Sequence, residues 1–281
     1  MRFVILARKT YDERKCQGNL WKTDEGNSVR SFADRMLCLA LDVGEGMLKN
    51  GAEIYRVEES VRMICKSYGA VHVEVFAITS LIVASVRLAN DECSMQMRRV
   101  YTSSYHLLKI EALNDVSRRI CSAPPTLEAF EAMIRDAKKQ TKYPNIIHVF
   151  GGVLAASSFT IVFGGSLFDA LVAAVMGLIV SLIGLMPLKN MNLTTKYIIL
   201  SFFCGLITCL LVRVGIGHNE HKIMIGTIML LIPGLAFGNS FRELLSGEII
   251  SGFFRLIQSC LTAVMIAVGF GLAIFLMELM L

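Results

Sequence analysis

The stretch ALVAAVMGLIVSLIGLMPL, residues 170–188, contains no charged side chain. A bilayer core about 30 Å thick needs about 20 helical residues to cross it, so this stretch is long enough to span a membrane. Four further uncharged runs cover residues 143–168, 197–212, 223–241 and 256–277, and Arg213 can extend the shortest of them by reaching the interface. We therefore predict five transmembrane helices, at about residues 146–164, 169–188, 197–213, 223–240 and 256–277.

The chain outside these runs has a different composition. Residues 1–145 hold 22 of the 28 Lys and Arg and 18 of the 23 Asp and Glu, although 54% of all 281 residues are hydrophobic. This contrast predicts an α-helical integral membrane protein with an N-terminal cytoplasmic α+β domain. We divide the chain into a polar leader (residues 1–30), the α+β domain (31–143) and the membrane domain (144–281). The net charge of +5 is small and no basic run is interleaved with aromatic residues, so nucleic acid is not an expected partner.

Residue periodicity places the elements of the N-terminal part. Apolar residues recur at three and four positions from Phe32 to Met47, which predicts a helix ended by Gly51. Strict alternation in residues 71–76 predicts a strand. Together with similar patterns, these signals give the order helix, helix, strand, strand, strand, helix, helix, at about residues 32–47, 54–68, 71–76, 80–88, 95–101, 105–120 and 126–139.

Positive charges in the short loops orient the membrane helices. With the N-terminal part inside, the inner loops carry four basic residues and the outer loops carry two. We therefore expect a cytoplasmic N-terminus and a C-terminus outside. Because transporters built from inverted repeats usually have an even number of spans in total, five spans could be half of such a transporter. The inner residues are Lys189, Lys196, Arg242 and Arg255, and the outer residues are Arg213 and Lys222.

A proline interrupts the fourth uncharged run. Pro233 and Gly234 follow Ile232, and a proline within a helix removes a backbone donor. In a membrane such a break is tolerated where the freed backbone groups are buried or line a polar cavity. Asn239 and Arg242 follow the break, so we predict a substrate-binding or translocation site there.

Asp169 at the start of the second span allows two interpretations. A carboxylate at a helix N-terminus is favoured electrostatically, so Asp169 can simply cap the helix. The alternative is a role in proton or substrate passage at the outer mouth of the protein.

Residues 44–58 form the densest polar cluster of the N-terminal part. Arg56, Glu59 and Arg62 follow at steps of three, and Glu58 and Arg62 at four, so they can pair along one helix face. A solvated, salt-bridged helix would look the same. No recognised catalytic, phosphate-binding or metal-binding motif is present, and the eight cysteines form no C-x-x-C pair. We therefore expect no enzyme activity, no cofactor, no bound metal and reduced cysteines.

Two groups of motifs resemble one family. The first is Gly51-Ala52-x-x-x-Arg56-Val57-Glu58, followed by Val75-Phe76-x-x-Thr79-Ser80. The second comprises Gly164-Gly165-Ser166-x-x-Asp169 and Ile232-Pro233-Gly234-x-x-x-Gly238-Asn239-x-x-Arg242-Glu243. Over residues 31–275 these motifs are similar in order and spacing to the threonine/serine exporter (ThrE-like) family. We include Arg62 with Gly51, Ala52, Arg56, Val57 and Glu58 as the cytoplasmic motif.

The resemblance implies a secondary transporter of the bacterial inner membrane that exports threonine and serine and needs no cofactor. Long family members have about ten spans, so five spans resemble the split form of the family. In that form a YjjP-like larger subunit works with a YjjB-like smaller membrane subunit, and such systems are associated with succinate export. The implied partners are therefore the bilayer, a small-molecule substrate and a second subunit in a homo- or hetero-oligomer. The substrate stays open between a neutral amino acid and a dicarboxylate.

Two other functions fit parts of the sequence. A membrane-anchored sensor or scaffold would bind a metabolite through its cytoplasmic domain and use the spans only as an anchor. An enzyme could use the Arg56, Glu58 and Glu59 face for acid–base chemistry, but no nucleophile lies at a recognised spacing from a base.

Overall fold

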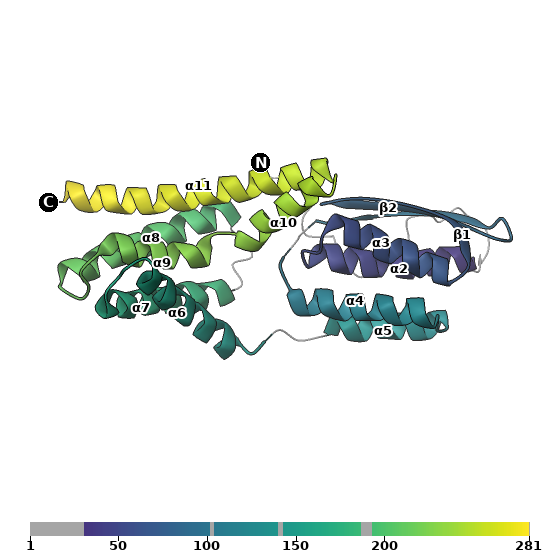
Figure 1. Cartoon of the computed structure of the whole chain (residues 1–281), viewed down its shortest axis with the longest axis horizontal. Coiled ribbons are helices and arrows are strands. Elements are labelled where there is room, and N and C mark those ends of the chain that lie inside the picture. The colour runs from purple at the N-terminus through teal and green to yellow at the C-terminus, as the bar shows by residue number, and fades with distance from the viewer. Residues whose placement is uncertain (1–30, 102–103, 140–142, 187–192, 281) are drawn as a thin grey trace, which may run out of the picture. The chain divides into compact units, whose positions relative to one another are not determined.

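A computed structural model of the chain describes residues 31–101, 104–139, 143–186 and 193–280. The predicted polar leader, residues 1–30, lies outside the described residues. The described part is mostly helical and includes a sheet of three strands. We call residues 31–139 the α+β region and residues 143–280 the helical region (Figure 1).

The α+β region confirms the predicted order of elements. Helices α2 and α3 come first, then strands β1, β2 and β3, then helices α4 and α5. Helix α2 ends two residues before Gly51, which has a positive φ of +90°. Thr126 accepts a hydrogen bond from the Ala129 amide at the start of α5, as its position predicts. The bounds are α2 Phe32–Lys49, α3 Ile54–Ser67, β1 Ala70–Ile78, β2 Leu81–Leu88, β3 Cys93–Arg99, α4 Leu107–Ser122 and α5 Leu127–Lys139.

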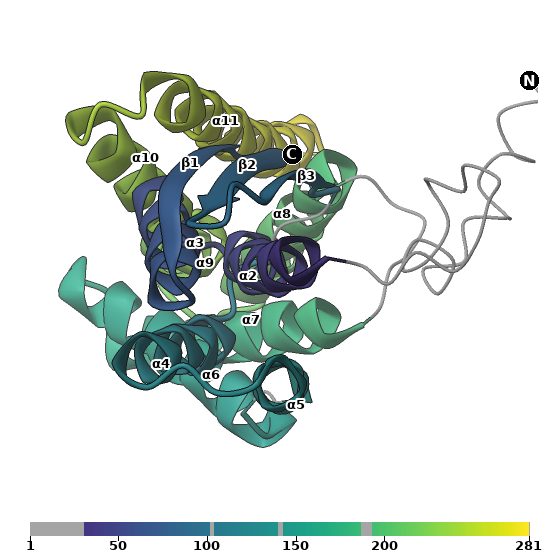
Figure 2. The ribbon, with the colours of Figure 1, turned by 90° about the vertical axis from the view of Figure 1, so that its right-hand side faces the viewer.

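The three strands form an antiparallel sheet in the order β1-β2-β3. Val75 lies opposite Ala84 and Val83 lies opposite Met97, so alternate side chains point to opposite faces. One face packs on α2 and α3, and α4 and α5 lie beyond those two helices (Figure 2). The region therefore has three layers: sheet, helix pair and helix pair.

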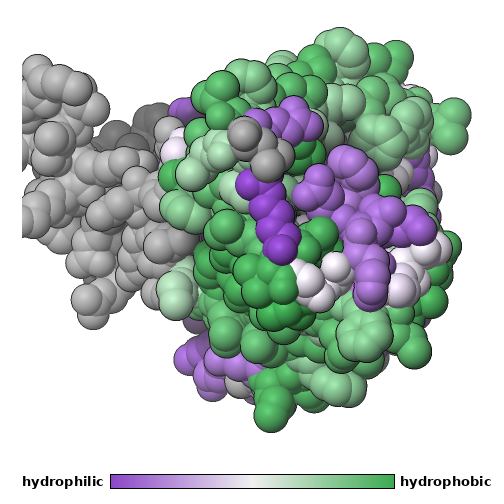
Figure 3. Space-filling model, turned by 90° about the vertical axis from the view of Figure 1, so that its left-hand side faces the viewer, coloured by the Kyte–Doolittle hydropathy of each residue, from purple (hydrophilic) through white to green (hydrophobic). Residues whose placement is uncertain are grey.

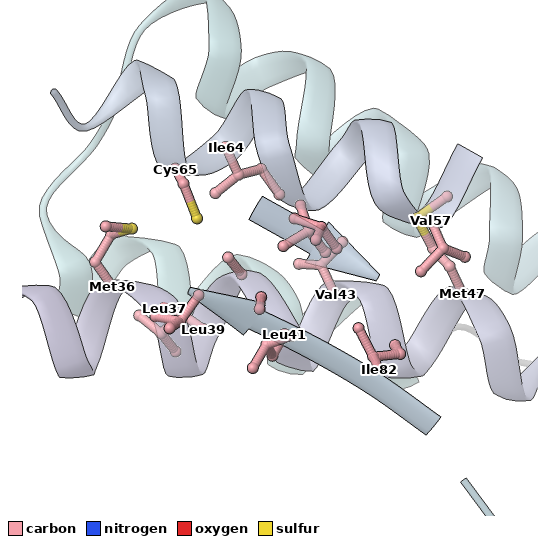
Figure 4. Packing of buried hydrophobic residues seen from close by; sticks show 14 of the residues in the cluster. Met36, Leu37, Leu39, Leu41, Val43, Met47, Val57, Ile64, Cys65 and Ile82 are labelled. Carbon is pink, nitrogen blue, oxygen red and sulfur yellow. The ribbon is translucent and has the colours of Figure 1, made fainter. Parts of the chain in front are cut away.

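The core of the α+β region lies between these layers. Met36, Leu37 and Ile64 are completely buried, and Figure 4 shows Cys65 and Ile64 of α3 pointing toward α2, which carries Met36. Helices α2 and α3 approach closely at Gly44, where an added Cβ would lie 2.7 Å from Val61 Cγ2. The hydrophobic effect thus explains why residues with helical and alternating periodicity adopt this arrangement.

The helical region contains α6 Asn145–Val162, α7 Leu167–Leu185, α8 Leu193–Arg213, α9 Glu220–Leu231, α10 Gly234–Leu245 and α11 Ile249–Leu279. Four of its helices are long and apolar enough to cross a membrane. The pair α9 and α10 passes the same test together and is bent by 57°, so the count is five if that pair is one span. The expected break at Pro233 is confirmed.

Helix α11 starts earlier than the uncharged run from which it was predicted. We expected Arg255 in a loop, but it is the seventh residue of α11 and is buried. Charge alone misplaced the start of this helix, because a buried carboxylate compensates Arg255, as described below.

Small residues set the spacing of the membrane-spanning helices. An added Cβ at Gly152 would collide with Ser181 of α7, and one at Gly269 would collide with Ser201 of α8. Such close approach is how helices associate in lipid, where apolar burial gives little advantage. Figure 3 views the end of the helical region where α11 terminates, and shows a hydrophilic patch surrounded by hydrophobic surface. Arg213, at the end of α8, donates to the Met277 carbonyl 2.6 Å away near that end of α11.

Candidate functional site

The helix break at Pro233 is an inverse γ-turn. Pro233 has φ −77° and ψ 62°, and the Gly234 amide donates to the Ile232 carbonyl at 2.8 Å. Because a proline has no N–H, the carbonyl of Met229 loses its helical donor. The break therefore leaves carbonyl hydrogen-bonding capacity at the end of α9.

A cavity with a mixed polar and apolar lining lies beside the last turn of α9. It has a volume of about 450 Å³ and is bounded by α6, α7, α8 and α9. Leu230 and Leu231, just before the break, form part of its wall. We call this the bundle cavity. Its polar side chains are His148, Ser181, Lys196 and Tyr197.

The bundle cavity lies at the end of the helices that is continuous with the α+β region. His148 is in the first turn of α6, whereas Ser181 is in the last turns of α7. Lys196 and Tyr197 begin α8, so all four side chains come from the same end of antiparallel helices. From the sequence, Lys196 was expected in an inner loop, whereas it lies in the first turn of α8, and the other three were not predicted. The sequence signal for the cavity was the pair Gly151 and Gly184, which line it and have open space beside them.

A second polar cluster joins the two regions of the chain. Arg255 of α11 donates through Nη2 to the Ala52 carbonyl at 3.1 Å, and its Nη1 lies 3.0 Å from Glu243 Oε1. The Ile54 amide at the start of α3 donates to the same Glu243 oxygen at 3.3 Å. Arg242 forms an ion pair with Glu53. We call these residues, Ala52 to Ile54 with Glu243, Arg242 and Arg255, the junction.

The charges of the junction are buried to different degrees. Glu243 is 2% exposed and Arg255 is 8% exposed, whereas Arg242 lies on the surface. Glu243 Oε2 has no hydrogen-bond partner among the described residues, and neither has the nearby buried hydroxyl of Ser251. An unpaired buried polar atom costs about 1–3 kcal/mol, so this part of the junction has unused bonding capacity.

Gly51 has two structural reasons to be glycine. Its φ of +90° is unfavourable for other residues, and it ends α2 in a Schellman motif in which the Ala52 amide donates to the Met47 carbonyl. An added Cβ would also lie 2.6 Å from Tyr105 Cδ1. This packing presents the Ala52 carbonyl to Arg255, and the accompanying burial raises the pKa of the Tyr105 hydroxyl.

The predicted cytoplasmic motif therefore separates into different roles. Arg56 lies 3.7 Å from Glu53, and Val57 is completely buried in the core. Glu58 accepts a hydrogen bond from the Ala77 amide of β1 at 2.7 Å, while burial raises the pKa of its carboxyl. Among the described residues, neither Glu58 nor Glu59 forms an ion pair with Arg62, so the expected pairing is wrong. Arg62 still lowers the pKa of the Glu58 carboxyl through its charge.

Asp169 lies at the opposite end of α7 from the bundle cavity. Its side chain and Ser166 form a capping box, which confirms the capping interpretation. Its Oδ1 also accepts the amides of His218 at 2.7 Å and Asn219 at 3.0 Å. Asp169 thus connects the start of α7 to the segment between α8 and α9.

Asn239 lies on α10, partly exposed, one helical turn before Arg242 and Glu243 of the junction. Pro233 and Gly234 lie at the break, so the predicted translocation residues occupy three places: the break, α10 and the far end of α7. The described residues include no group of three His, Cys, Asp or Glu side chains that could hold a metal ion, and their seven cysteines are free.

These features define a multi-pass membrane protein with an attached α+β region. The chain matches the model of the ThrE family, described as "Putative threonine/serine exporter", over residues 38–277. The chain therefore belongs to the threonine/serine exporter family, whose members are transporters rather than enzymes. No curated protein and no solved structure matches the chain significantly.

Proposed function

We propose that the chain exports threonine and serine, that the bundle cavity receives the substrate, and that the helix break forms part of the path. The observation that carries this proposal is the position of the cavity, where polar side chains of α6, α7 and α8 share the wall with Leu230 and Leu231, just before Pro233. Half-helix ends that face a polar site are the usual way in which transporters recognise charged groups.

The lining of the bundle cavity matches the groups of a hydroxy amino acid. Lys196 offers an ammonium group to the substrate carboxylate, and Ser181 and Tyr197 offer hydroxyls to the substrate hydroxyl. The carbonyl groups released at the break can accept hydrogen bonds from the substrate ammonium. The carboxylate and the ammonium group of the amino acid would therefore each meet a group of opposite polarity, Lys196 and the carbonyls at the break.

Succinate is the competing substrate. Its two carboxylates require two cationic groups, and the described lining contains one lysine and one histidine. Lys196 can pair with only one of those carboxylates. We therefore favour the amino acids and keep the dicarboxylate as an outcome of the experiment.

The same proposal includes the membrane in which the chain lies, its orientation and its partner subunit. We place the chain in the bacterial inner membrane with the α+β region in the cytoplasm, so that the bundle cavity opens toward the cytoplasm. Five spans favour a larger subunit that works with a smaller, YjjB-like membrane subunit. Asp169 and Asn239 then lie at the outer mouth and beside the path, respectively.

The junction gives the α+β region a means to control transport. Glu243 follows Arg242 on α10, the helix that begins at the break, so a movement of Gly51–Glu53 would be transmitted to that helix. The unpaired Glu243 Oε2 allows the carboxylate to change partners without losing an existing bond to that atom. We therefore propose that the junction acts as a gate.

The direct test is efflux of labelled threonine, serine and succinate. Cells would carry the chain alone, the chain with a small membrane protein encoded beside it, or neither. We expect faster efflux of threonine and serine with both chains. Unchanged efflux of all three compounds would contradict the proposal, and efflux of succinate alone would assign a dicarboxylate instead.

Variants test the site within that assay. Lys196→Gln removes a charge-assisted bond of about 1.5–3 kcal/mol, so we expect efflux to fall by about tenfold or more at limiting substrate. Pro233→Ala restores a helical donor and should slow efflux at all concentrations. Lys139→Gln removes an exposed lysine of α5 and is the matched control. Normal efflux of well-expressed Lys196→Gln and Pro233→Ala proteins would exclude the proposed site, and normal efflux of Arg242→Ala would exclude Arg242 from the gate.

A further inference from the structure

The α+β region contains a cavity that the proposed transport path does not use. Its volume is about 540 Å³, and it lies where the end of α2, the start of α4 and the end of α5 meet. We call it the lysine cavity. Its polar lining consists of Lys49, Asn50, Ser104, His106, Lys109 and Lys138.

The charge of the lysine cavity is positive. Its three lysines come from three different helices, and Lys109 and Lys138 form no ion pair within the described part of the chain. Two carboxylates oppose them: Glu45 lies 2.6 Å from Lys49, and Asp42 is influenced by both Lys138 and Arg98. Burial raises the pKa of the Asp42 carboxyl, whereas the charges of Lys138 and Arg98 lower it. The cavity therefore keeps an excess of cationic groups for a ligand.

The backbone adds to this preference for anions. Helix α4 begins at the cavity, and its N-cap residue His106 belongs to the lining. The positive end of its dipole is thus directed toward the same space as Lys109. Converging ammonium groups together with helix amides are typical of sites for phosphate groups.

The lysine cavity is connected to the junction by adjacent residues. Lys49 and Asn50 line the cavity, and Ala52, two residues later, provides the carbonyl that Arg255 binds. The carbonyls of Lys49 and Asn50 accept the amides of Ser104 and His106, at 2.8 and 3.1 Å, so the two walls of the cavity are tied together. A ligand that draws the walls closer would pull on the segment that contacts α10 and α11.

We propose that the lysine cavity binds a small metabolite that carries phosphate or diphosphate groups, and that this binding changes the junction. The site is regulatory and lies apart from the bundle cavity. Its existence does not depend on which compound the protein exports.

The first test measures binding to the purified full-length chain in detergent. Pyrophosphate is the probe, and citrate at the same ionic strength represents a polycarboxylate. We expect pyrophosphate to bind more tightly than citrate, and the Lys109→Gln and Lys138→Gln variants each to lose about tenfold in affinity. Lys139→Gln, adjacent to Lys138 but paired with Asp136 outside the cavity, is the control and should bind normally.

Three results would overturn this assignment: no binding of pyrophosphate, tighter binding of citrate, or equal losses in Lys139→Gln and Lys138→Gln. Circular dichroism and gel filtration would show that each variant is folded. The lysines lie at the surface or are half-buried, so neutral replacements should not disturb the core.

The second test measures the connection to the junction. Hydrogen exchange of peptides that contain residues 50–55 should slow when pyrophosphate is added. The Lys109→Gln and Lys138→Gln double variant should show no such change. Binding without any effect on these peptides would refute the regulatory part of the proposal, whereas the efflux assay alone decides the transported substrate.

Discussion

The α+β region and the helical region place polar and apolar side chains in opposite ways. In the α+β region large apolar residues such as Phe130 form one buried core, although Phe76, Met95 and Met97 of the sheet are exposed. In the helical region many large apolar residues are exposed, and the buried residues include a series of hydroxyl side chains. That series is Thr160, Ser181, Ser201, Thr208, Thr227, Ser240, Ser251 and Ser259.

The difference follows from the surrounding solvent. Water drives apolar groups together, so the α+β region is stabilised by burial. Lipid does not, so the helical region depends on close contact between small residues. Several of its hydroxyls bind a carbonyl of their own helix: Thr160 donates to the Ala156 carbonyl at 2.9 Å, and Thr227 donates to the Ile223 carbonyl at 3.0 Å. The four predictions below test this contrast, from the largest expected effect to the smallest.

Two phenylalanines should respond very differently to truncation. Phe130→Ala removes a side chain that is 0% exposed and should cost about 3–5 kcal/mol of unfolding free energy in the α+β region. Phe275→Ala removes one that is 63% exposed on α11 and should cost much less in detergent. Thermal unfolding of the purified proteins checks both. Equal losses would contradict the assignment of α11 to a lipid environment.

Two glycines on one helix provide a matched pair in the helical region. Gly269→Ala places a methyl group against Ser201 and the Ile198 carbonyl, so we expect a loss of about 1–3 kcal/mol. Gly271 has no atom within 4 Å of an added Cβ, and Gly271→Ala should be neutral or slightly stabilising. Resistance to heat-induced aggregation in detergent measures the difference. If both substitutions are neutral, helices α8 and α11 do not depend on close packing.

Helix caps should contribute in both regions. Ser166→Ala removes the capping box of α7 and should cost about 1 kcal/mol. Thr126→Ala removes a longer hydrogen bond of 3.4 Å and should cost less. Hydrogen exchange of the first turn of each helix reports the loss locally. A larger effect at Thr126 would be inconsistent with these geometries.

Replacing Glu58 should change stability least of the four cases, and the size of the change depends on pH. Its pKa is raised in the folded protein, chiefly by burial. Its contribution to stability is therefore complete below the ordinary pKa of about 4.5 and is lost as pH rises through the folded value. Glu58→Gln retains an acceptor for the Ala77 amide but cannot ionise. When the pH rises from 4.5 to 7, the amides of β1 should therefore lose less protection against hydrogen exchange in the variant than in the unsubstituted protein. Hydrogen exchange corrected for intrinsic rates measures this, and identical pH profiles would refute it.

Local signals predicted most of the fold. Uncharged runs identified α6, α7, α8 and α11, because the cost of placing charge in lipid is a property of each segment. Pro233 predicted the break between α9 and α10, since the missing N–H is a property of one residue. Alternation and helical periodicity predicted the order of the seven elements from α2 to α5.

The candidate site could be predicted only in part. Pro233, Gly234 and Gly51 were identified from the chain because each has an unusual backbone requirement. His148, Ser181 and Tyr197 were not, since each is an ordinary residue that becomes part of a site only when three helices meet. Glu243 and Arg255 were missed as a pair for a related reason: the two charges are acceptable in a buried place only together.

The sequence by itself thus determined which segments enter the membrane, where one of them breaks and how the α+β elements follow each other. These properties depend on composition, periodicity and the chemistry of single residues. Tertiary structure alone decided that Ala52 meets Arg255, more than two hundred residues further along the chain, and that four helix ends enclose the bundle cavity. Such contacts depend on how whole helices pack. Side-chain size and charge pairing between residues far apart in the sequence determine that packing, and a local sequence pattern contains no information about such pairs.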